Sequence, residues 1–118
     1  MLFRSILQIG RALVENALRH TPTGTRVRVR AGRENGRALL VVEDDGPGIA
    51  PKDAVQVFER FYRGDGAARA SGSGLGLAIA RELAEAMQGE IALTSEPGRT
   101  IFTLSLPAAS GVSSPPLE

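Results

Sequence analysis

The sequence lacks several residues and segments that whole classes of protein require. It contains no cysteine, which excludes disulfide bonds, thiolate zinc sites and cysteine nucleophiles. A single histidine, His20, excludes any metal site built from several histidines. The longest aliphatic run, residues 38–42, is far too short to cross a bilayer, and residues 1–9 lack the apolar stretch of a signal peptide. A formal net charge of +1 disfavours a dedicated nucleic-acid binder, so we expect neither a nucleic-acid partner nor membrane contact by this segment.

The only lysine, Lys52, excludes two common nucleotide-binding motifs. A P-loop requires a Gly-Lys-Ser/Thr run, and an ordinary protein-kinase fold requires a strand lysine after its Gly-rich loop. Lys52 follows Pro51 and fits neither pattern. If the chain binds a nucleotide, it therefore uses a different kind of cradle.

The 118 residues, with 42% hydrophobic and 23% charged side chains, have the size and composition of one small globular domain. Apolar spacing predicts helices at 5–20, 51–62 and 75–87. The second should carry the apolar contacts Val55, Phe58, Phe61 and Tyr62, and Gly89 should cap the third. Alternation predicts two hairpins, 26–31 with 38–43 around Asn35-Gly36, and 90–95 with 100–106. In the first strand, Val27, Val29 and Ala31 should share the buried side. This order predicts an α+β fold: a two-layer α/β sandwich whose mixed, mostly antiparallel sheet packs against about three helices. Residues 64–74 bury little and should be mobile, and 108–118 should form a disordered tail.

Two polar motifs at the ends of predicted elements could carry chemistry. Asn16 lies on or beside the apolar face of the first helix, where its amide is either an ordinary buried group bonded to backbone or a ligand for Mg²⁺. Asp44 follows a strand directly, and Gly46 and Gly48 lack the Cβ atoms that would keep a flat ring away. That carboxylate could accept a hydrogen bond from the exocyclic amine of adenine, although Asp, Gly and Pro are also ordinary turn residues.

Two further segments allow a functional and a purely structural interpretation. Residues 58–63 interleave aromatic side chains with arginine. This pattern fits a core segment with solvated charges between the aromatics, or a nucleic-acid patch. It also fits a lid that the aromatics anchor and whose Arg60 or Arg63 reaches a phosphate. The run Gly72-Ser73-Gly74-Leu75-Gly76-Leu77 opens a helix, whose free backbone N–H groups suit a phosphate. The alternative for this run is a flexible linker, and its spacing is not that of the dinucleotide fingerprint.

In their order along the chain, these segments resemble the boxes of one protein family. Asn16-Ala17, Asp44-x-Gly46-x-Gly48, Phe58-x-Arg60-Phe61 and Gly72-x-Gly74-x-Gly76-Leu77 resemble the N, G1, F and G2 boxes of the catalytic, ATP-binding domain of sensor histidine kinases. The resemblance, over about residues 7–107, implies the histidine-kinase/Hsp90-like ATPase fold, with 1–107 as the ATP-binding domain. The run Gly98-x-Thr100-x-Phe102 also resembles the closing hairpin of this family.

The resemblance implies a role for each matching residue. Asn16 would coordinate the Mg²⁺ that bridges the phosphates of ATP, and Asp44 would bind the adenine amino group. Arg60 or Arg63 would contact the γ-phosphate or orient a lid over residues 61–73. Glu15 would assist phosphotransfer or support Asn16. The other residues implied around the nucleotide are Arg19, His20, Gly46, Gly48, Ile49, Gly72, Gly74, Leu75, Gly76, Leu77 and Thr100.

The chain departs from the family pattern in three places. Ala12 stands where many members have a polar residue and where gyrase-like ATPases have the glutamate that activates water, so hydrolysis loses its general base. Nothing within these 118 residues resembles the pair of dimerisation helices of the family. The short strand that usually comes before the first helix is also missing, so we expect a fragment or an unusual start.

As a whole, the resemblance implies a cytoplasmic protein-histidine kinase domain. It would transfer the γ-phosphoryl group of Mg-ATP to a histidine on a separate dimerisation domain, with a response regulator as an indirect partner in two-component signalling. The isolated chain should be unable to phosphorylate itself. The alternatives are a stand-alone serine kinase of the anti-sigma type and a nucleotide-binding fragment without catalysis.

Overall fold

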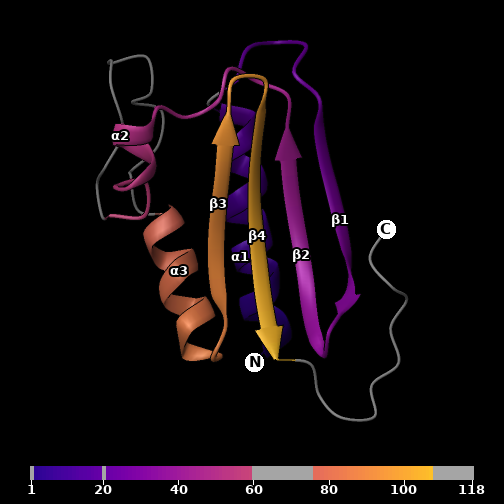
Figure 1. The fold of residues 1–118 in the computed structure, drawn as a ribbon. Helices are drawn as coiled ribbons and strands as arrows, with labels where there is room; N and C mark the ends of the chain where they lie inside the picture. Colours follow the sequence, from indigo (N-terminus) through magenta and orange to yellow (C-terminus); the bar gives the residue numbers. More distant parts are fainter. Residues whose placement is uncertain (1, 20, 60–75, 108–118) are drawn as a thin grey trace.

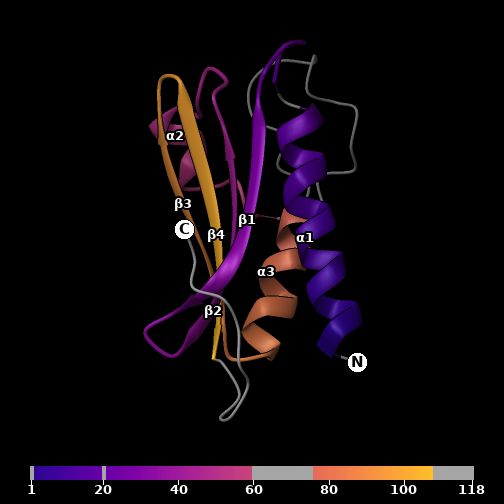
Figure 2. The ribbon, with the colours of Figure 1, turned by 90° about the vertical axis from the view of Figure 1, so that its right-hand side faces the viewer.

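The computed structural model describes residues 2–19, 21–59 and 76–107. Figure 1 and Figure 2 show two layers, a twisted antiparallel sheet and two long helices that lie side by side on one of its faces. No helix among these residues is long and apolar enough to span a bilayer. The elements are α1 (Leu2–Arg19), β1 (Val27–Glu34), β2 (Arg37–Asp44), α2 (Pro51–Ala54), α3 (Gly76–Ala86), β3 (Glu90–Glu96) and β4 (Arg99–Pro107).

The four strands lie in the order β1-β2-β4-β3, and every neighbouring pair is antiparallel. Both predicted hairpins are confirmed. Asn35 and Gly36 adopt the left-handed backbone, with φ of 53° and 77°, that a tight hairpin turn demands. The two-layer α+β fold is confirmed as well, and all strand pairs described in this sheet are antiparallel.

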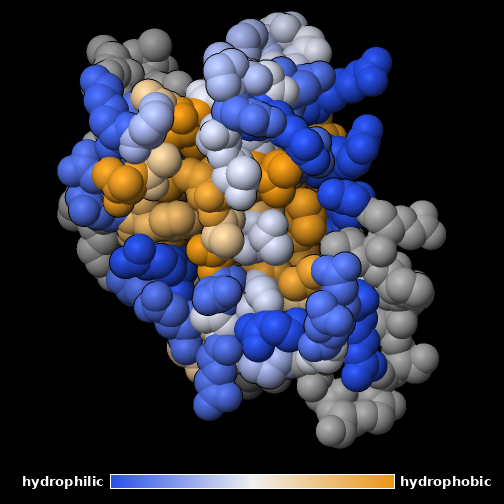
Figure 3. Space-filling view, in the orientation of Figure 1, coloured by the Kyte–Doolittle hydropathy of each residue, from blue (hydrophilic) through white to orange (hydrophobic). Residues whose placement is uncertain are grey.

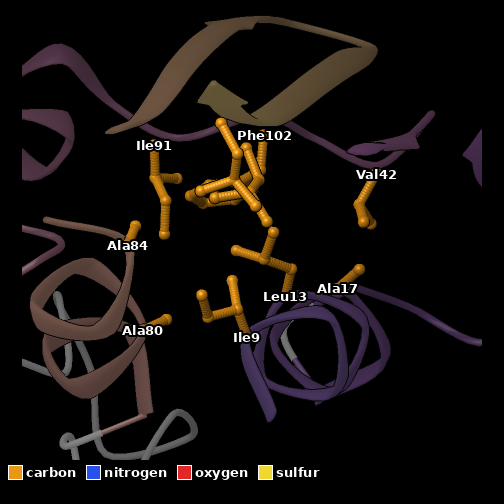
Figure 4. Packing of buried hydrophobic residues seen from close by; sticks show 10 residues of the cluster. Ile9, Leu13, Ala17, Val42, Ala80, Ala84, Ile91 and Phe102 are labelled. Atoms are coloured by element: carbon orange, nitrogen blue, oxygen red, sulfur yellow. The ribbon is translucent and has the colours of Figure 1, made fainter. Parts of the chain in front are cut away.

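The core lies between the helices and the sheet (Figure 4). Ile9, Leu13 and Ala17 recur every four residues on α1 and are almost completely buried. Ala80 and Ala84 on α3 are equally buried, and their small size lets the two helices approach each other and the sheet. The sheet contributes mainly Val42, Ile91, Phe102, Leu104 and Leu106.

Two predicted helix boundaries were wrong. The first helix begins at Leu2 rather than at Ser5. Residues 2–4 include no proline or glycine, so nothing there prevents the helix from beginning earlier. The second, predicted over 51–62, ends at Ala54. Beyond it the amide of Gln56 donates to the carbonyl of Asp53 and that of Glu59 to Gln56, so tight three-residue turns replace the helical pattern. The predicted apolar contact Val55 is consequently 80% exposed, and Phe61 and Tyr62 lie outside the described residues.

The cap of the third helix also differs in detail. Gly89 was predicted to be its capping residue, but the left-handed residue is Gln88, with φ of 63°. The amide of Gly89 instead donates to the carbonyl of Ala84 at 2.8 Å and so closes the last turn. A Cβ on Gly89 would meet Leu106 and the carbonyl of Ser105, so close packing on β4 requires glycine there.

Alternation predicted that Val27, Val29 and Ala31 share the buried side of β1, and this was wrong for two of the three. Val27 is half-buried and packs against the core. Val29 is 50% exposed and Ala31 is exposed. β1 is an edge strand, so it has a neighbour on one side only and the helical layer covers it incompletely.

The opposite face of the sheet carries no helix among the described residues. Figure 3 shows hydrophobic side chains gathered at its centre inside a hydrophilic rim. Val41 lies on this face and is still only 5% exposed. Glu43 beside it faces Arg99 at 3.1 Å and Arg30 at 3.7 Å, so charges on three adjacent strands alternate in sign across the face.

Candidate functional site

The C-terminal end of α1 lies against the turn that follows β2. The hydroxyl of Thr21 donates to the carbonyl of Ala17 at 2.6 Å and folds the chain back over the helix end. A Cβ on Gly46 would lie 2.8 Å from Thr21 Cγ2, so the two segments touch. The predicted motif around Asn16 and the predicted motif around Asp44 are therefore neighbours. Asn16 is half-buried, Arg19 is exposed, and His20 lies outside the described residues.

Asp44 is a buried carboxylate at the end of β2, with only 6% of its surface exposed. Burial raises the pKa of Asp44, and the nearby charges of Asp45 and Glu43 add to the rise. The amide of Gly46 donates to Asp44 Oδ1 at 3.0 Å, and this hydrogen bond acts in the opposite direction by lowering the pKa of Asp44. Because a desolvated carboxylate is unfavourable without donors, this position is suited to a ligand that brings an N–H group.

The adjacent carboxylate, Asp45, serves the fold. It is exposed, and its Oδ1 accepts from the amide of Arg26 at 2.8 Å. Its own amide donates to the carbonyl of Arg26 at 3.2 Å. These two bonds fasten the start of β1 to the end of β2. Of the two neighbouring aspartates, only Asp44 is thus left for a ligand.

Gly48 brings the same turn onto the β3–β4 hairpin. Its φ is +90°, and a Cβ there would lie 2.6 Å from the carbonyl oxygen of Glu96. The next amide, of Ile49, donates to Ser95 Oγ at 2.7 Å, and Ser95 Oγ lies 3.0 Å from Thr100 Oγ1. Thr100 was predicted at this site and is 3% exposed. Ser95 was not predicted, although the register of the hairpin, which sets it opposite Thr100, could have revealed it.

We expect Gly48→Ala to lower the free energy of unfolding by roughly 1–3 kcal/mol, the usual range for a strained backbone position. The new Cβ would meet the carbonyl of Glu96. Gly24→Ala is a matched control, because Gly24 has a similar φ of +95° and nothing within 4 Å of its Cβ position. Thermal melting of both variants measures the difference. Equal losses would mean that backbone strain alone, without the close approach, requires glycine at 48.

The start of α3 lies beside α1. A groove of about 490 Å³ runs between them and is lined by Glu15 and Ala12 from α1 and by Gly76, Ile79 and Ala80 from α3. Glu15 pairs with Arg11 at 2.9 Å within this groove. The structure therefore brings two predicted site residues, Glu15 and Gly76, together, while Asn16 does not line the groove. The predicted residues Arg60, Arg63, Gly72, Gly74 and Leu75 lie outside the described residues.

Phe58 anchors the segment that leads toward residue 60. Its ring packs edge-on against Phe102 with centroids 6.0 Å apart. The guanidinium of Arg81, on α3, lies 5.7 Å from the centroid of the same ring. Phe58 thus belongs to the edge of the core, and the nucleic-acid interpretation of 58–63 gains no support from it.

Comparison with known families agrees with this geometry. The family described as "Histidine kinase-, DNA gyrase B-, and HSP90-like ATPase" matches residues 3–110. The chain belongs to this ATPase family. It is 48% identical over 99 residues to "Sensor-like histidine kinase SenX3" of Mycobacterium tuberculosis, a match that covers 81% of this chain and 24% of that protein. It is 41% identical over 98 residues to "Sensor histidine kinase CusS" of Escherichia coli K12, covering 81% of this chain and 20% of that protein.

Solved structures place the ATPase domain in the histidine-kinase branch. "Mycobacterial sensor histidine kinase MprB" superimposes with a TM-score of 0.75 at 31% identity, covering 96% of this chain and 74% of that chain. The structure titled "Crystal structure of ShkA full-length in complex with AMPPNP" gives 0.76 at 31% identity, over 92% of this chain and 22% of that one. The chain is a histidine-kinase catalytic domain and spans about a quarter or less of the two curated relatives.

Proposed function

We propose that this ATPase domain binds Mg-ATP and donates the γ-phosphoryl group to a histidine on a separate dimerisation domain of a sensor kinase. The observation that carries the proposal is the buried carboxylate of Asp44, set in a glycine turn that touches both the end of α1 and the β3–β4 hairpin. We place the domain in the cytoplasm, where ATP is available, with a response regulator as its indirect partner.

The residues around Asp44 suit an adenine base. The carboxylate would accept a hydrogen bond from the exocyclic amine, which offsets its desolvation. A Cβ at position 46 would clash with Thr21, so only glycine allows the turn to pack this closely against Thr21. Thr100, opposite Asp44 on the next strand, adds a buried hydroxyl to the same place. Ile49 follows the turn and packs at the edge of the core.

The phosphates would extend from this pocket toward the start of α3. The N–H groups of a helix N-terminus attract anions, and Gly76 and Leu77 begin that helix. Asn16 supplies an amide oxygen for Mg²⁺, which when bound neutralises the charge on the phosphates. Arg19, at the exposed end of α1, adds a positive charge on the same side. Positioning and charge neutralisation are most of what phosphoryl transfer requires of a protein.

The acceptor imidazole would itself attack the γ-phosphorus while the bond to the bridging oxygen of ADP breaks. No water has to be activated, so the chain needs no general base at position 12. Ala12 lines the groove between α1 and α3, and Glu15 there is paired with Arg11. This arrangement favours phosphotransfer over hydrolysis. Glu15 would instead help to orient its neighbour Asn16.

We expect no acid-labile phosphate on this chain after incubation with Mg-ATP labelled at the γ-phosphate. Its single histidine, His20, belongs to the nucleotide motif and is a poor acceptor. Adding the histidine-bearing dimerisation domain of a sensor kinase that the chain resembles should yield acid-labile label on that domain. Calorimetry with Mg-ATP provides the control for binding.

Other outcomes of this experiment would each contradict a specific part of the proposal. Acid-stable label on serine would favour the anti-sigma type of kinase. Label on His20 would mean that the acceptor lies in the nucleotide site. Binding of ATP with no transfer to any dimerisation domain tested would favour a nucleotide-binding fragment.

A further inference from the structure

We propose that Ser95 is a positioning residue for the nucleotide base, acting through the hydroxyl of Thr100 and through the turn at Ile49. This inference rests on the proposed nucleotide-binding function and deepens it. It concerns how the pocket distinguishes adenine from guanine. Ser95 does not have to touch the base for this role, because both of its hydrogen-bond partners lie in segments that form the pocket.

The three polar side chains form a row across the sheet. Ser95 is paired with Thr100 between β3 and β4, and Thr100 is paired with Asp44 between β4 and β2. Directly opposed residues of antiparallel strands present their side chains on the same face, with Cβ atoms about 4.5–5.5 Å apart. The row lies at the end of the helix-facing side, one step beyond the buried pair Val42 and Phe102.

The first member of the row fixes the direction of the hydrogen bonds. The amide of Ile49 can only donate, so Ser95 Oγ accepts from it at 2.7 Å. Ser95 then has one proton left, and its oxygen lies 3.0 Å from Thr100 Oγ1. If Ser95 donates that proton, the proton of Thr100 is free to point toward Asp44 or a ligand. If Thr100 donates instead, only its lone pairs face the carboxylate.

Asp44 decides between these two arrangements. An ionised carboxylate only accepts, so it favours the arrangement in which the Thr100 proton points toward it. The row then runs as a chain of donors from Ile49 through Ser95 to Thr100, with the acceptor Asp44 beside its last proton. When the amine of a bound base donates to Asp44, the Thr100 proton is released from the carboxylate and can turn to a ring nitrogen of that base. Adenine offers a complementary edge, an amine donor next to a ring-nitrogen acceptor. Guanine offers an oxygen acceptor next to an N–H donor, the reverse order.

Calorimetric titration with Mg-ADP and Mg-GDP tests the role of Ser95. The wild-type chain should prefer ADP. Ser95→Ala should weaken ADP binding roughly tenfold, a usual effect of leaving a buried polar group unpaired, with little change for GDP, so that discrimination falls. Ser95→Thr keeps the hydroxyl and should keep the discrimination. Thr94→Ala, which removes an exposed hydroxyl from the opposite face of the same strand, is the matched control.

Thr100→Val removes the last hydroxyl of the row and should reduce discrimination between ADP and GDP, as Ser95→Ala does. This second variant keeps the inference testable if Ser95→Ala folds poorly. Equal losses for ADP and GDP, together with a lower melting temperature, would reduce Ser95 to a purely structural residue. Unchanged discrimination in both variants would overturn the inference while leaving nucleotide binding intact. A wild-type chain that binds neither nucleotide would overturn the proposed function itself, before any variant is compared.

Discussion

Replacing Asn16 with alanine should abolish the Mg²⁺ dependence of ATP binding and weaken that binding by at least about 100-fold, since loss of even an outer-shell partner of a metal costs 10- to 100-fold. No cluster of three His, Cys, Asp or Glu side chains in the described part of the chain could hold a metal ion. Mg²⁺ in nucleotide sites is usually held by one or two protein oxygens together with phosphate oxygens, so the loss of one protein ligand should be costly. Titration of ATP in Mg²⁺ and in EDTA measures the effect.

Two further variants make the Asn16 experiment decisive. Asn16→Asp keeps a hard oxygen at the same place and should retain part of the Mg²⁺ dependence. Gln8→Ala removes an exposed amide two turns earlier on α1 and should leave binding unchanged. Asn16 is only half-buried, so the fold should survive the change, and a melting curve verifies this. Full Mg²⁺-dependent binding by Asn16→Ala would remove Asn16 from the metal site.

Asp44→Asn should have two effects of opposite sign. ATP affinity should fall by about 1–3 kcal/mol, because the new amide can present a donor to the adenine amine where the carboxylate accepted. The nucleotide-free chain should melt at a higher temperature, because the substitution removes a desolvated charge while Oδ1 can still accept from Gly46. Stability given up for function in this way is typical of binding sites.

The pH dependence of stability follows from the same carboxylate. The pKa of Asp44 is raised above its ordinary value of 3.8, chiefly by burial, so the folded state binds the proton more tightly than the unfolded state does. The stabilising contribution of the protonated form is complete below 3.8 and is lost as the pH rises through the folded-state pKa. ATP affinity should increase over that same interval, because the ionised carboxylate is the acceptor.

Asp45→Asn is the control for both Asp44 measurements. Asp45 is exposed and holds the amide of Arg26, a bond that an asparagine oxygen can keep. Its effect on adenine preference should be small. Equal affinities for ATP and GTP in the wild-type chain would contradict the role of Asp44. A melting temperature of Asp44→Asn below that of the wild type would contradict the cost that we assign to its buried charge.

Features that depend on neighbours along the chain could be predicted from the amino-acid sequence alone. Asn35-Gly36 predicted the first hairpin, because few other dipeptides tolerate positive φ at both positions. The four-residue spacing of Ile9, Leu13 and Ala17 predicted which face of the first helix is buried. The glycine and asparagine motifs, taken in order, indicated the ATPase family. These signals are local, so a single sequence contains them.

Features that depend on contacts between distant segments could not be predicted in this way and became visible only in the folded chain. The exposure of Val29 follows from the position of β1 at the sheet edge, which alternation within one strand cannot reveal. The different tasks of Asp44 and Asp45 follow from which of them faces the helices. Ser95 joins the site because strand register sets it beside Thr100 while the turn brings the amide of Ile49 to it. Burial and hydrogen-bond partners are properties of the packed chain, and they are decided when the sheet and helices come together.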